Sequence, residues 1–200
     1  IVRDEKGKAD KIPGLFKDIK GVGWYMDEFK RAQISINFNN YKVSTIHDVF
    51  DKACELGVER GVRVTGSELV GLIPREALLM AGRHYLKMQR RTTAVPEADL
   101  IECAVQSLGL NDLYPFKPEE KIVEFAVGQS TGQLSGLTSD GFVDELSSNS
   151  PAPGGGSVAA LAGSLGAALV SMVAALTHEK KGFEASQDEM DAMGNKAQEI

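Results

Sequence analysis

The sequence predicts an α+β region, with a mixed sheet that carries helices on one face and contains a βαβ unit, followed by the start of an all-α helical domain. Strand-type alternation and helix-type spacing of apolar residues both occur up to residue 127, whereas only helical spacing occurs from residue 138 onward. The residues between them are rich in Gly, Ser and Thr and nearly free of charge, as in flexible connectors. We therefore predict domains over 1–127 and 138–200, joined by a linker over 128–137.

Composition and charge are those of a globular protein. Of the 200 residues, 42% are hydrophobic and 25% are charged, and the net charge of −6 disfavours nucleic acid as a partner. Cys54 and Cys103 match no metal-ligand spacing, so we expect reduced core cysteines, no metal site and a cytoplasmic location. We recognise no signal peptide. Because the chain lacks an initiator Met and stops within a helical pattern, we expect a segment of a longer enzyme.

Two stretches near the start of the chain have the pattern of strands. Residues 21–26 (GVGWYM) are β-prone, and residues 32–38 (AQISINF) alternate strictly between apolar and polar side chains. The polar face of the second strand carries Gln33, Ser35 and Asn37. This face is either solvated or lines a cleft with hydrogen-bond donors and acceptors.

A helix and a further strand complete the predicted βαβ unit. Thr45 and Asp48 form a capping-box pattern at the start of a helix. Residues 61–73 (GVRVTGSELVGLI) have the composition of a strand, interrupted by a Gly-Ser pair that suggests a bulge or a close backbone approach. The strands before and after the helix are expected to be parallel neighbours with a right-handed crossover.

Later helices are marked by proline and by helical spacing. Prolines suited to the first helical turn open predicted helices at residues 74, 96 and 118. A short helix is predicted over 141–146, and another begins at residue 186.

The most distinctive stretch is a glycine turn that leads into an apolar helix. Pro151 and Pro153 favour an extended approach, three glycines at 154–156 permit positive φ and a close ligand, and Ser157 is a suitable N-cap. Amide groups and the helix dipole at such a turn favour an anion. The predicted ligand-binding residues are Pro153, Gly154, Gly155, Gly156 and Ser157.

The helix after this turn has no polar face, so we expect it to be buried. Its larger apolar residues form one stripe from Val158 to Leu176. A membrane span has this length, but Ala dominates the composition and no aromatic residues flank the run, so we predict no transmembrane segment. A core helix whose glycines serve only packing is the remaining alternative.

Several stretches together resemble the formiminotransferase-cyclodeaminase family. The glycine turn and its helix, SPAPGGGSVAALAGSLGAALVSMV at 150–173, are similar to the opening of the cyclodeaminase domain. GVGWYMDE at 21–28, QISINF and STIHDVF within 33–50, TGSELVGLIPREALL at 65–79 and LGLNDLYPFKPEEKIVEF at 108–125 are similar to the C-terminal subdomain of the transferase.

The resemblance implies a folate enzyme of histidine degradation. The family transfers the formimino group of N-formimino-L-glutamate to tetrahydrofolate, here expected to be polyglutamated, and then forms 5,10-methenyltetrahydrofolate and ammonia. The family's catalytic residues fall upstream of Ile1 and beyond Ile200, so His47, His84 and His178 inherit no role. A transferase-side cleft would contain Gln33, Ser35, Asn37, Ser67 and Glu68.

The small-residue surface of the apolar helix predicts a homo-oligomer, because one truncated domain cannot cover it. Two other functions remain open. One is a non-catalytic module for folate binding or oligomerisation, and the other is a relative of methenyltetrahydrofolate cyclohydrolase. The transferase-like residues 20–127 disfavour the latter, since that activity does not need them.

Overall fold

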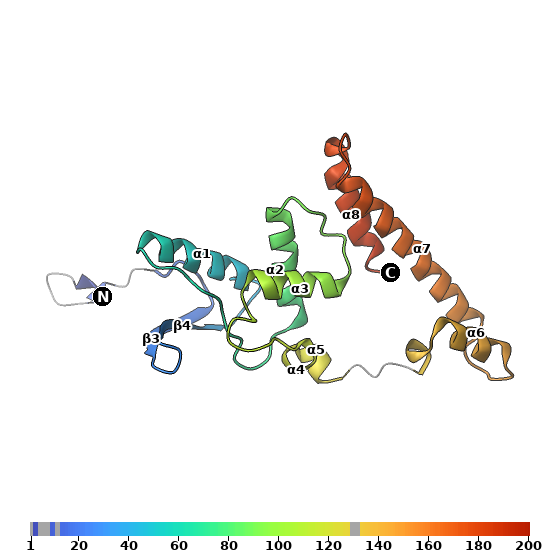
Figure 1. The fold of residues 1–200 in the computed structure, drawn as a ribbon, viewed down its shortest axis with the longest axis horizontal. Coiled ribbons are helices and arrows are strands. Elements are labelled where there is room, and N and C mark those ends of the chain that lie inside the picture. Colours follow the sequence, from blue (N-terminus) through green and yellow to red (C-terminus); the bar gives the residue numbers. More distant parts are fainter. Residues whose placement is uncertain (1, 4–8, 11–12, 129–132) are drawn as a thin grey trace. The chain divides into compact units, whose positions relative to one another are not determined.

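The computed structural model describes residues 2–3, 9–10, 13–128 and 133–200. The chain divides into two compact units, Ile1–Val64 and Thr65–Ile200. Residues 1, 4–8 and 11–12, and residues 129–132 of the predicted linker over 128–137, lie outside the described residues. The predicted α+β region followed by a helical region is confirmed at this level (Figure 1).

The first unit contains an antiparallel hairpin and one helix. Strands β3 (Ile19–Met26) and β4 (Arg31–Phe38) pair over their full length, with Trp24 opposite Gln33. Both strands were predicted, because their alternation and β-prone residues are local signals. The short strands β1 (Val2–Arg3) and β2 (Ala9–Asp10) form a second antiparallel pair.

Helix α1 (Ile46–Glu59) begins where the capping pattern predicts. The Thr45 hydroxyl accepts a hydrogen bond from the Asp48 amide at 3.3 Å and donates one to the Asp48 carboxylate at 2.6 Å. The pair therefore satisfies one of the free amides of the first turn.

The strand predicted over 61–73 does not form, and with it the predicted βαβ unit is wrong for this structure. The backbone of this segment makes other hydrogen bonds: the Ser67 amide donates to Gly109 O at 3.1 Å, and the Ile73 amide donates to Lys121 O at 2.9 Å. Ile73 and Ile122 form one isolated parallel bridge. The predicted close backbone approach is confirmed, since a Cβ on Gly66 would lie 3.0 Å from Gly109 O.

The core of the second unit lies between α2 (Arg75–Met88) and α3 (Glu97–Ser107), which begin after Pro74 and Pro96. The two helices approach closely at Gly82, where an added Cβ would overlap the backbone carbonyl group of Leu100. The core side chains that are less than one-tenth exposed are Ile73, Ala77, Leu78, Leu79, Ala81, Tyr85, Leu86, Leu100, Ile101, Ala104, Val105, Leu108 and Ile122.

The helix predicted from Pro118 is split into two single turns, α4 (Pro118–Lys121) and α5 (Val123–Ala126). Ile122 between them is extended, with φ −95° and ψ 125°, and its side chain is fully buried. The bridge to Ile73 is made by its chain neighbours, because the Ile73 amide donates to Lys121 O at 2.9 Å and the Val123 amide donates to Ile73 O at 3.0 Å.

The C-terminal elements are η1 (Gln133–Gly136), α6 (Ser139–Ser147), α7 (Gly155–His178), η2 (Glu184–Ser186) and α8 (Gln187–Ala197). Helices α7 and α8 pack side by side as a helical hairpin (Figure 1). The face of α7 that is buried carries Ala167, Ser171, Ala174 and His178, mostly small residues that allow close approach.

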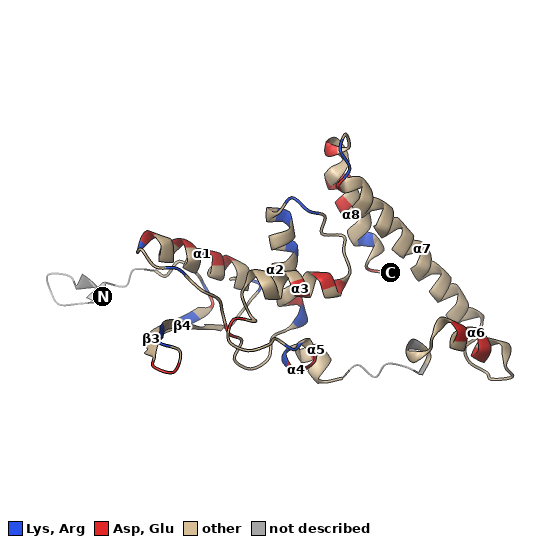
Figure 2. Ribbon diagram, viewed as in Figure 1, with Lys and Arg blue, Asp and Glu red and all other residues tan. Residues whose placement is uncertain are grey.

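The prediction that α7 is buried on all sides is wrong for this structure. Leu161, Leu165, Leu169 and Leu176 are between 44% and 67% exposed, because α8 covers only the face with small residues. Figure 2 shows that α7 carries no Lys, Arg, Asp or Glu along its whole length. By length and composition α7 is long and apolar enough to cross a membrane, which is weak evidence for a span.

Candidate functional site

The glycine turn forms the N-terminus of α7. Pro153, which follows a cis peptide bond, is buried, whereas the three glycines are exposed. Gly154 is the N-cap in extended conformation and provides no side-chain cap. The first helical hydrogen bond runs from the Val158 amide to Gly154 O at 3.1 Å, so the amides of residues 155–157 precede the regular ladder.

The predicted N-cap, Ser157, is wrong by three positions. Gly155 and Gly156 are already helical, so Ser157 lies within the first turn rather than before it. Its side chain is half-buried. Its hydroxyl makes no hydrogen bond to another described residue.

The three glycines do not adopt the positive φ angles that the sequence suggests for them. None of them has positive φ. A Cβ added to Gly154, Gly155 or Gly156 would meet no atom of the described chain within 4 Å. Within the described residues, neither a positive φ nor a close packing contact requires glycine at these positions.

The residues predicted for a transferase-side cleft belong to two separate units. Gln33, Ser35 and Asn37 share one face of β4, with Gln33 and Ser35 half-buried and Asn37 exposed. The alternation predicts that the apolar face of β4 is buried. This prediction is wrong at Ile34, which is 65% exposed because nothing in the described first unit covers it. Ser67 and Glu68 lie in the second unit.

Ser67 has a structural role in the second unit. Its hydroxyl donates to Leu108 O at 2.6 Å, and its amide donates to Gly109 O. Glu68 is exposed. The Ser67 hydroxyl is therefore already engaged, and Glu68 alone retains a free polar surface there.

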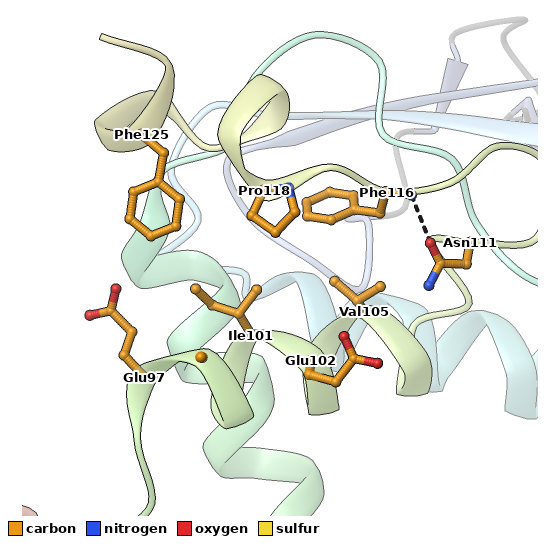
Figure 3. A pocket seen from close by; sticks show the side chains of 9 residues that line it. Glu97, Ile101, Glu102, Val105, Asn111, Phe116, Pro118 and Phe125 are labelled. Carbon is orange, nitrogen blue, oxygen red and sulfur yellow. Dashed lines mark hydrogen bonds between the residues drawn. The ribbon is translucent and has the colours of Figure 1, made fainter. Parts of the chain in front are cut away.

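A hollow that the sequence did not reveal lies beside α3. It has a volume of about 380 Å³, and Figure 3 shows Phe116 and Pro118 on one side, opposite Ile101 and Val105. The remaining lining residues are Glu97, Ala98, Glu102, Asn111 and Phe125. A sequence signal for this hollow is the aromatic and proline residues within 114–125. They come after the helical pattern of α3 and do not extend it.

The two carboxylates and the amide oxygen that line this hollow have partners within the chain. Glu97 pairs with Arg75 at 3.3 Å, Glu102 accepts from Gln106, and the Asn111 carbonyl oxygen accepts from the Phe116 amide at 2.7 Å. Nearby, the hydrogen bond and charge of Glu120 raise the pKa of the exposed Lys117 ammonium group. The hollow is therefore an apolar surface without convergent free polar groups.

Comparisons with known proteins divide the chain into two matched regions. The family described as "Formiminotransferase domain" matches residues 2–128, and the family described as "Formiminotransferase-cyclodeaminase" matches residues 138–200. The glycine turn falls in the second region, and the hollow and β4 fall in the first.

Individual relatives agree with both matches. The chain is 39% identical over 184 residues to formimidoyltransferase-cyclodeaminase of Dictyostelium discoideum and 41% identical over 182 residues to that of Mus musculus. Each alignment covers 90% of this chain and 34% of the relative, so the chain spans about a third of the length of these relatives.

A shorter match reaches a different enzyme. The chain is 54% identical over 46 residues to methenyltetrahydrofolate cyclohydrolase of Methylorubrum extorquens, which covers 23% of the chain and 22% of the relative. The two family matches together cover nearly all of the sequence in one order, and on that basis the chain belongs to the formiminotransferase-cyclodeaminase family.

Proposed function

We propose that this chain is the junction segment of a bifunctional folate enzyme. The enzyme transfers the formimino group of N-formimino-L-glutamate to tetrahydrofolate and then cyclodeaminates the product to 5,10-methenyltetrahydrofolate and ammonia. The observation that carries the proposal is the presence of both family regions, in that order, in one chain. The order matches a sequence of two reactions on one folate.

The glycine turn is the proposed folate site of the deaminase half. It presents early helical amides, a free Ser157 hydroxyl and three positions without side chains where a flat ring can lie against the backbone. The glutamate tail of folate is anionic, which suits the positive end of the helix dipole. The proposed substrate is a polyglutamated folate, and the site needs no metal.

For the transferase side, Gln33, Ser35 and Asn37 on β4 remain proposed ligand-binding residues in the first unit, and the exposed Glu68 remains a separate proposal in the second unit. Amide and hydroxyl groups on a strand can pair with the donors and acceptors of a pterin ring without adding charge. Because Ser67 already donates to Leu108 O, its proposed contribution is to hold the backbone of this segment.

Two further observations support the proposed location and assembly. Cys54 and Cys103 are both free, which supports a cytoplasmic protein. The exposed leucines of α7 form an apolar stripe that α8 does not cover, which supports a homo-oligomer.

The test uses the whole protein that contains this chain. Formimino transfer and ammonia release are measured separately for Gly155→Val, with Gly163→Val in the same helix as the control, since neither site has an atom within 4 Å of an added Cβ. We expect Gly155→Val to lower the deaminase kcat/KM by about tenfold or more and to leave formimino transfer unchanged. We expect Gly163→Val to leave both activities unchanged.

A second substitution separates ligand binding from folding. Because Ser157 does not cap α7, Ser157→Ala is expected to leave stability unchanged and to raise the deaminase KM. Unchanged deaminase kinetics in both Gly155→Val and Ser157→Ala would contradict the proposed site. Absence of both activities in the wild-type protein would favour a non-catalytic folate-binding or oligomerisation module.

The short cyclohydrolase match supports one second candidate function. If hydrolysis of 5,10-methenyltetrahydrofolate is detected and both formimino reactions are absent, the chain belongs to a cyclohydrolase-type enzyme. The transferase-type residues 2–128 are then left without a reaction, which is why we favour the bifunctional enzyme.

A further inference from the structure

A buried polar cluster joins the two family regions within the second unit. It lies where the loop between α2 and α3 meets helices α7 and α8 (Figure 1). The loop residues Thr92, Thr93 and Ala94 belong to the region matched to the formiminotransferase domain, and both helices belong to the region matched to formiminotransferase-cyclodeaminase. All three loop residues are at most 3% exposed.

Asp191 is the centre of this cluster. One of its carboxylate oxygens accepts hydrogen bonds from the Thr92 hydroxyl at 2.6 Å and from the Thr93 amide at 3.2 Å, and the other accepts from the Thr93 hydroxyl at 3.4 Å. The Asp191 side chain is 20% exposed. A largely buried carboxylate that accepts from three donors of the other family region is costly to leave unpaired. Moving the loop away from α8 would therefore cost free energy at Asp191.

Neighbouring residues of α8 and α7 extend the contact. The Asn195 amide group donates to the Thr93 hydroxyl at 2.9 Å, and the Gln198 amide group donates to the Ser171 hydroxyl at 2.8 Å, which lies 3.5 Å from Ala94 O. His178 lies beside the same carboxylate, with its Nε2 atom 3.8 Å from Asp191 Oδ1.

Steric fit at the contact is independent of these hydrogen bonds. A Cβ on Gly194 would overlap Ala94 Cβ and lie 3.2 Å from Ala174 Cβ. Gly194 therefore allows α8 to touch the loop and α7 at the same place. Hydrogen bonding and close packing both select this docked arrangement.

We propose that Asp191 anchors an intramolecular docking surface, through which the transferase-type region and the deaminase-type helices stabilise each other. The loop continues directly into α3, whose first residue, Glu97, pairs with Arg75 at the start of α2. Because the loop leads directly into α3, we expect loss of the anchor to loosen the first turns of α3 as well as α8. The reverse also holds, because a coupling free energy acts equally in both directions.

The test measures amide hydrogen exchange and thermal unfolding of the full chain. Asp191→Ala is expected to increase exchange in the first turns of α3, and Thr92→Val is expected to increase exchange in α8. Asp188→Asn removes an exposed carboxylate from the same helix and serves as the control. It should leave exchange in α3 unchanged.

A double-mutant comparison makes the result decisive. If Thr92 and Asp191 act through their mutual contact, the Tm decrease of the double variant is clearly smaller than the sum of the single decreases. If Asp191→Ala fails to fold, Asp191→Asn and Thr92→Val provide the same cycle. Additive Tm changes, or exchange increases confined to the mutated region, would overturn the proposal.

Discussion

Cys54 shows how a residue's surroundings change its chemistry without making it a functional site. Burial, and secondly the charge of Asp51, raise the pKa of the Cys54 thiol. Both causes disfavour the thiolate, which is the nucleophilic form. The residue is therefore less reactive than an ordinary cysteine at neutral pH.

The pH dependence of Cys54 alkylation follows from this direction. At about pH 8 we expect slower reaction with iodoacetamide than for a cysteine in an unstructured peptide, and a rate that continues to rise at higher pH. Asp51→Asn removes one cause of the raised pKa and should increase the rate about twofold. The rate is measured by mass spectrometry of the Cys54 peptide. A rate that is unchanged in Asp51→Asn would show that burial alone sets the pKa.

At the scale of elements, glycines have two opposite roles in the helices. Gly82 lies where α2 meets the backbone of α3, and an added Cβ would overlap the Leu100 carbonyl group. Gly163 lies within α7, and an added Cβ would meet no atom within 4 Å. The same substitution therefore has opposite expected effects at the two sites.

Gly82→Ala and Gly163→Ala form a matched pair. The first should lower the free energy of unfolding by about 3 kcal/mol, because the helices must move apart. The second should raise it by about 0.5–1 kcal/mol, because alanine reduces the entropy of the unfolded chain. Urea unfolding followed by circular dichroism measures both. Equal effects at the two sites would mean that α2 and α3 can separate at little cost.

At the scale of the whole molecule, the apolar stripe of α7 is an exposed apolar feature that α8 does not cover. Leu165 and Leu169 are each 59% exposed, one helical turn apart. Soluble monomers rarely leave such a continuous stripe open to water. This is the physical basis of the proposed homo-oligomer.

Light scattering after size-exclusion chromatography tests this assembly. The chain is expected to elute with a mass above its monomer mass of 21.5 kDa. Leu169→Glu should shift it toward the monomer, because a charge in an apolar contact remains unpaired. Val58→Glu, at a 72% exposed position of α1, is the control and should have no effect. A monomeric wild-type chain would exclude self-association through α7.

The sequence alone determined the elements whose signals are local. The strands at Ile19–Met26 and Arg31–Phe38, the start of α1 at the Thr45 cap and the starts of α2 and α3 after prolines depend on residues within about one helical turn or on strand alternation. The family resemblance was also readable from sequence, because it lies in contiguous motifs.

Tertiary structure decided the features that need a distant partner. A strand over 61–73 requires a neighbouring strand, but its backbone is bonded to the loop and helix ends at 109–121 instead. Ile122 interrupts a helical pattern because it bridges Ile73. Burial of α7 depends on what covers it, and α8 contacts the small residues rather than the leucines. The Asp191 cluster joins residues about a hundred positions apart, beyond the reach of any local pattern.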